Sequence, residues 1–102
     1  MTRTVTLADG TTLTLTANMN TFADYEELTG KAMAEPDKTM RGARDRIWAF
    51  LHQAHPDLTT RDVGNMLAPG DPDFECILGA IQELAEAMNP PAAGATPRRG
   101  RP

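Results

Sequence analysis

The first sixteen residues alternate between apolar and polar side chains, and this pattern constrains the fold more than any other feature of the chain. Valine and leucine stand two apart on both sides of Ala8-Asp9-Gly10-Thr11, with threonines between them. A period of two indicates strands, and the Asp-Gly pair indicates a tight turn, so residues 2–16 should form a β-hairpin. Because a lone hairpin is marginally stable in water, we expect helices to cover its apolar face.

After the hairpin, the spacing of apolar residues changes to that of helices. The first helix should begin at Thr21, where a capping-box pattern opens, and should end at Gly30. Phe22, Tyr25 and Leu28 fall on one face of it, and we expect that face to be buried.

A loop over residues 32–38 should separate this helix from a longer one. The longer helix is expected from Met40 to His55, where a proline follows, and its apolar arc is wide enough to contact other elements on more than one side. Trp48 lies beside the apolar stripe of this helix. Further on, Thr59 predicts the N-cap of a short helix.

The last helix should begin at Asp73, and it has the clearest apolar stripe in the chain. The stripe comprises Phe74, Ile77, Leu78, Ile81, Leu84, Ala85 and Met88. Residues 90–102 are rich in Pro, Ala, Gly and Arg, a composition that predicts a disordered tail. The expected fold class is therefore α+β, mainly α: a single domain over residues 1–89 in which the hairpin packs on a bundle of about four helices.

Composition argues against several classes of function. The net charge is −4, although three of the ten basic residues, Arg98, Arg99 and Arg101, lie at the C-terminal end. The rest of the chain is therefore acidic and poorly suited to nucleic-acid phosphates. One cysteine cannot form an internal disulfide, no run of about 20 apolar residues predicts a membrane span, and no export signal is visible. We expect a cytoplasmic protein with no nucleic-acid or membrane partner.

The candidate chemical groups are better explained as structural. His52 and His55 stand three apart, a spacing that suits a metal ion, but no further ligands accompany them, and we expect both to cap the helix C-terminus. Cys76 lies within an apolar stripe and should be a small core residue rather than a nucleophile. The acidic run at residues 71–75 fits a helix start better than a calcium loop. We therefore expect no enzyme, no metal and no cofactor.

One stretch raises an alternative function. Residues 58–67 are similar to the first helix of a helix-turn-helix, which would suit a small DNA-binding regulator of a mobile element. The helix that follows opens with Asp71, Asp73 and Glu75, and these carboxylates would repel phosphates. A DNA-shift assay separates this alternative from a protein-binding function.

Together, residues 4–88 resemble the tail assembly chaperone family of long-tailed bacteriophages, related prophages and gene transfer agents. Three features carry the resemblance: the hairpin over Thr4–Thr16, the segment Tyr25-Glu26-Glu27-Leu28-Thr29-Gly30-Lys31, and the order of the helices that follow. That order places Ile47-Trp48-Ala49-Phe50-Leu51 in the long helix and His55-Pro56-Asp57-Leu58-Thr59 after it, before a short helix and a final amphipathic one.

The resemblance implies a non-structural protein that binds the tape measure protein in the host bacterial cytoplasm and shields its hydrophobic helices. Such a protein helps recruit tail tube subunits and is absent from the mature virion. In this family a longer form, commonly made by programmed ribosomal frameshifting, engages the tube protein, and an extension of that kind would start near Pro90. The resemblance leaves a homo-oligomer open, and a head–tail connector component of the virion is a further alternative.

We expect partner contacts on side chains that combine apolar area with an adaptable shape. Trp48 is the first candidate, because it flanks the core stripe and tryptophan is frequent at binding hot spots. Methionine adapts its shape to a partner helix. The other candidates are Met40, Arg44, Met66 and Met88. For Met66 and Met88, a position inside the core is the competing interpretation.

Overall fold

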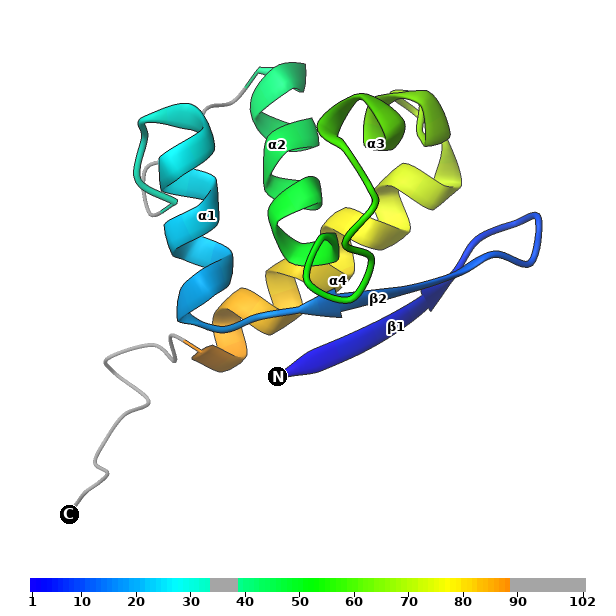
Figure 1. Ribbon diagram of the computed structural model, residues 1–102. Helices are drawn as coiled ribbons and strands as arrows, with labels where there is room; N and C mark the ends of the chain where they lie inside the picture. The colour runs from blue at the N-terminus through cyan, green and yellow to red at the C-terminus, as the bar shows by residue number, and fades with distance from the viewer. Residues whose placement is uncertain (34–38, 89–102) are drawn as a thin grey trace, which may run out of the picture.

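The computed structural model describes residues 1–33 and 39–88, except for the side chain of Met88. Within these ranges the elements are β1 (Thr2–Thr6), β2 (Thr12–Thr16), α1 (Met19–Thr29), α2 (Met40–Leu51), α3 (Thr60–Met66) and α4 (Pro72–Met88). Figure 1 shows the hairpin lying along one side of the helices. The expected fold class is confirmed for the described residues: α+β, mainly α, with an N-terminal hairpin on four helices. The predicted tail and most of the predicted loop lie outside these ranges.

The hairpin forms as its alternation predicts. β1 and β2 pair antiparallel, and Thr4 stands opposite Thr14. At the turn, the backbone N–H of Thr11 donates to Asp9 Oδ1 at 2.8 Å, and this hydrogen bond lowers the pKa of the Asp9 carboxyl. Gly10 has a φ of 92°, a left-handed conformation that favours glycine. The valine and leucine side chains of the two strands are buried, so one face of the hairpin belongs to the core.

α2 is the central helix of the fold. It contacts α1, α3, α4 and β2, as its wide apolar arc predicts. Ile47, Phe50 and Leu51 are almost fully buried, and they share one core cluster with Leu15 of β2 and Ile77 of α4. Burial of side chains of this size stabilises a fold by about 1.5–3 kcal/mol each. The core therefore lies where α2 meets the hairpin and α4.

α1 begins earlier than predicted. Its N-cap is Asn18, whose Oδ1 accepts the N–H of Thr21 at 3.2 Å, while Thr21 Oγ1 accepts the N–H of Asn18 at 3.2 Å. The predicted start at Thr21 is wrong because Thr21 already serves as the third helical residue of this capping box. At the other end Gly30, with a φ of 73°, ends the helix as predicted.

Three further predictions are corrected by the packing. Leu28 is 46% exposed rather than buried, because it lies in the last turn of α1, at the end of the α1–α2 pair away from the hairpin (Figure 1). Cys76 is exposed rather than internal, because it precedes Ile77 and so lies about 100° round α4 from the buried stripe. α2 ends at Leu51 rather than at His55, since turns follow it.

No helix in the described part of the chain combines the length and the apolar character that a membrane span requires.

Candidate protein-binding site

A hollow of 270 Å³ opens between α2, α3 and the start of α4. We call it the α2–α3 groove. It is lined by Met40, Arg41, Arg44, Ile47, Val63, Gly64, Leu67, Pro69 and Phe74. Most of these side chains are apolar, including an exposed methionine from α2, and two arginines from the same helix are the charged residues of the lining.

Local interactions of α3 create one wall of the groove. Thr59 and Asp62 form the predicted capping box, in which Asp62 N–H donates to Thr59 Oγ1 and Thr59 N–H to Asp62 Oδ2, each at 3.0 Å. Val63 is buried, so the start of α3 is fixed on the core. At Gly64 a Cβ atom would stand 3.3 Å from Cδ of Arg44. The absence of a side chain at Gly64 thus lets the stem of Arg44 pass close to α3.

The two arginines of the groove differ in their electrostatic state. Nε and Nη2 of Arg44 each lie 3.1 Å from Oδ1 of Asp45, whose side chain is only 8% exposed. Arg44 therefore forms an ion pair with a buried carboxylate, and leaving that carboxylate unpaired would be costly in free energy. Arg41 is exposed and forms no ion pair with any described residue. Its guanidinium is available to a partner's carboxylate.

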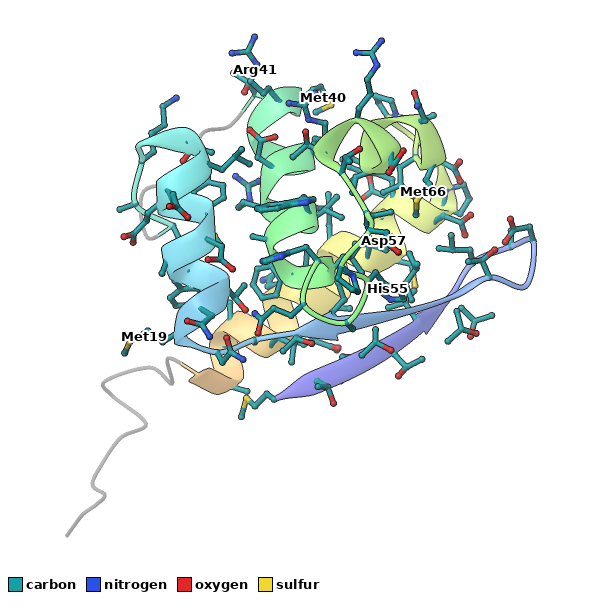
Figure 2. The ribbon with its side chains drawn as sticks, in the orientation of Figure 1. Met19, Met40, Arg41, His55, Asp57 and Met66 are labelled. Atoms are coloured by element: carbon teal, nitrogen blue, oxygen red, sulfur yellow. The ribbon has the colours of Figure 1, made fainter. Side chains whose placement is uncertain are left out.

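Two of the predicted partner-binding residues meet in this groove. Met40 and Arg44 both line it, and Met40 is 57% exposed. Figure 2 shows Met40 and Arg41 at the N-terminal end of α2, the end remote from the hairpin. Met40 and Arg41 thus form an apolar and cationic border to the groove.

Trp48 lies outside the groove and has structural contacts. Its Nε1–H donates to the carbonyl oxygen of Leu58 at 3.0 Å, and its ring stacks on that of His52 with centroids 4.3 Å apart. The ring is half-buried against the core. The hydrogen bond connects α2 to the loop that leads into α3, and Trp48 does not line the groove.

The other two predicted partner residues are not brought to the groove. Met66, labelled in Figure 2 at the end of α3, is half-buried and packs against the core. It does not line the groove. Met88 is the last residue of α4, and its side chain lies outside the description.

The two histidines contact other elements instead of capping α2 with their side chains. His52 Nε2 stands 2.7 Å from Asp24 Oδ2 of α1, an ion-pair distance without hydrogen-bond geometry. His55 Nε2 accepts the backbone N–H of Thr14 at 3.0 Å. The capping prediction holds for the position of His52, which is the C-cap residue of α2 and donates its backbone N–H to Trp48 O. It is wrong for His55, which lies beyond the helix end. Among the described residues, no three His, Cys, Asp or Glu side chains gather in a way that could hold a metal ion.

The sequence reasoning missed several groove residues, Arg41 and Gly64 among them. A signal existed for Arg41, because it stands three residues before Arg44 and the two therefore share one side of α2. No local signal identifies Gly64, since its role depends on how close α3 lies to α2.

The size and lining of the groove suit a protein partner. Pockets for drug-sized molecules enclose about 300–1,000 Å³, whereas 270 Å³ in an open groove is the scale of one or two side chains. Apolar walls next to a guanidinium that no described residue pairs favour a partner with an apolar anchor and a carboxylate close to it. Comparisons of this chain with protein-family models, with curated proteins and with solved structures give no match.

Proposed function

We propose that this protein is a non-enzymatic tail assembly chaperone of the long-tailed phage type. It binds the tape measure protein in the host bacterial cytoplasm, helps recruit tail tube subunits through a frameshift-extended form, and is absent from the mature virion. The observation that supports this proposal best is the α2–α3 groove, an apolar surface with no covering element in the described part of the chain.

The shape of the groove supports helix binding. Two helices, α2 and α3, form its walls, and grooves between helices accept amphipathic helices that project apolar anchors every three or four residues. Met40 adds an exposed, flexible side chain that can adapt to anchors of different size. A chaperone for long amphipathic helices needs this tolerance, because successive segments of its partner differ in sequence.

The charge of the groove supports a choice among such helices. Because Arg41 has no ion pair among the described residues, it gains most from a partner helix with Asp or Glu beside its apolar anchor. The rest of the protein is acidic, so other surfaces would repel an acidic partner helix, whereas Arg41 would attract it to the α2–α3 groove.

A DNA-binding regulator receives less support. The first turn of α4, which would approach DNA in a helix-turn-helix arrangement, carries Asp73 and Glu75. Asp73 also accepts the N–H of Ala8 at 3.0 Å, so its carboxylate is held at that position.

Co-purification with the tape measure protein tests the proposal. The full chain is co-expressed with a tagged tape measure protein encoded by the same genome, and the captured amount is measured. We expect capture by the unmodified chain and a loss of about ten-fold or more for the double variant Met40→Glu, Arg41→Glu, because it places two carboxylates beside the apolar anchor.

A matched control is Arg61→Glu, which makes the same charge change as Arg41→Glu at an exposed position on α3 outside the groove lining. Its capture should equal that of the unmodified chain. Failure of the unmodified chain to capture the tape measure protein would refute the function. Equal capture by the double variant would refute only the site.

A further inference from the structure

The outer edge of β1 has main-chain groups that no other part of the described structure uses. The N–H of Leu7 donates to Thr11 O at 2.7 Å, and that of Ala17 donates to Met1 O at 2.8 Å, so the odd-numbered residues of β1 bond to β2. In an antiparallel pair the residues between them point their N–H and C=O groups away from the partner strand. Every second residue of β1, from Thr2 to Thr6, therefore presents these groups outward.

The corresponding edge of β2 is partly covered by other elements. His55 Nε2 accepts the N–H of Thr14, and the hydroxyl of Thr21 donates to Thr16 O at 2.8 Å. Beyond the end of β1, the N–H of Ala8 donates to Asp73 of α4. Proteins usually protect sheet edges, because free edges pair with other chains. The outer edge of β1 has no such protection among the described residues, and its three threonines are exposed.

A groove of 380 Å³ runs along this free edge, between β1 and α4. We call it the β1–α4 groove. On its helix side the lining residues include Cys76, Gly79 and Ala80, which leave space beside the strand. No described heavy atom outside the helix itself lies within 4 Å of the position that a Cβ of Gly79 would occupy. The groove therefore has room for a further extended segment next to β1.

The charges of this groove favour a basic segment. Glu83 pairs with Arg3 across the groove, whereas the side chain of Glu75 forms no ion pair with the described residues. The lining thus carries one carboxylate in excess, within a chain that is itself acidic. A lysine or arginine on the incoming segment would complement Glu75.

We propose that the β1–α4 groove binds an extended, basic segment of another protein, which adds to β1 as a third strand. The main-chain groups of Thr2, Thr4 and Thr6 provide the hydrogen bonds, and Glu75 selects for the positive charge. This mode gives affinity through the backbone and specificity through alternate side chains. None of the residues that line the β1–α4 groove also lines the α2–α3 groove.

Amide hydrogen exchange in the full chain tests the proposal. The probe is a blocked heptapeptide of alternating threonine and valine in which two threonines are replaced by lysine. At saturating, millimolar peptide we expect the amides of Thr4 and Thr6 to exchange at least about ten-fold more slowly, because a third strand removes them from water. In an extended peptide, alternate amides point to the same edge. An analogue N-methylated at the alternate amides that face β1 should lose binding, whereas one N-methylated at the amides of the opposite edge should keep it.

Variants and a second peptide sharpen the test. Gly79→Leu should fill the groove and abolish the protection, while Ala23→Leu adds a leucine at an exposed position of α1 and should leave it intact. The same heptapeptide with glutamate in place of lysine should bind at least several-fold more weakly. Unchanged exchange at Thr4 and Thr6, or equal protection in Gly79→Leu, would overturn strand addition. Equal binding of the glutamate peptide would overturn the preference for a basic segment.

Discussion

The two grooves of this protein differ in the groups that they offer a partner. The α2–α3 groove offers side chains: apolar walls, an exposed Met40 and the guanidinium of Arg41, which no described residue pairs. The β1–α4 groove offers main-chain hydrogen-bonding groups, small side chains and the carboxylate of Glu75. A helix has already satisfied its own backbone and can contribute only side chains, whereas an extended segment brings unsatisfied N–H and C=O groups. The first groove is therefore suited to helices and the second to strands, with opposite preferences for charge.

The largest expected effect comes from removing the core that both grooves share. Phe50 of α2 is 1% exposed and belongs to the cluster that joins α2 to the hairpin and α4. Phe50→Ala should lower the free energy of unfolding by about 3–5 kcal/mol, as measured by urea denaturation, and both binding activities should fall together. Phe22→Ala, at a half-buried position of α1, should lower the free energy of unfolding by clearly less. If one groove kept its affinity while the protein lost this much stability, the two surfaces would not depend on a common core.

An intermediate effect is expected from opening the protected edge of the sheet. His55→Ala removes the acceptor of the Thr14 N–H, and the half-buried donor should cost about 1 kcal/mol or somewhat more in stability. It also creates a second free edge, so we expect concentration-dependent association in sedimentation experiments. Figure 2 shows His55 in the loop after α2, next to β2.

His55→Gln serves as the control for this change, because its amide oxygen can accept the same hydrogen bond. It should retain most of the stability and remain as monodisperse as the unmodified chain. Association of the two variants to the same extent would mean that His55 does not protect the edge.

The smallest effect on stability is expected at Gly64. Replacing a helical glycine with alanine stabilises a helix by roughly 0.5–1 kcal/mol, but the new methyl group would stand 3.3 Å from the flexible stem of Arg44. Gly64→Ala should therefore change the melting temperature little or raise it slightly. Capture of the tape measure protein should still fall several-fold, because the methyl group narrows the α2–α3 groove. Unchanged capture would indicate that the partner does not enter the hollow at Gly64.

The fold was largely predictable, because its signals are local. The alternation of residues 2–16, the cap at Thr59 and the stop at Gly30 each depend on neighbours within a few residues, and each prediction is confirmed. The predicted start of α1 was wrong because Asn18 forms a capping box with Thr21, a pairing without the usual Glu or Gln at the third helical residue. The predicted burial of Leu28 was wrong because burial at the end of α1 depends on how far a neighbouring helix extends beside that end.

The candidate site was less predictable, because grooves depend on contacts between distant segments. Met40 and Arg44 were predicted to contact a partner, but the hollow that both line exists only because α3 packs beside α2. Trp48 was the first candidate, and its contacts turn out to be with His52 and the backbone of Leu58. An exposed apolar residue in a pattern can bind a partner or a neighbouring element equally well.

By itself, the sequence determined the elements of this protein, their caps and their apolar faces, because periodicity and capping act over a few residues. It also determined the hairpin, whose two strands pair only with each other among the described residues, so that each has one further edge. Only the tertiary structure decided which edge stays open: the loop after α2 brings His55 to β2 from 41 residues away. Along β1, α4 leaves a groove where its side chains are small. Closing an edge needs a donor or acceptor from a distant segment, and only packing places that group.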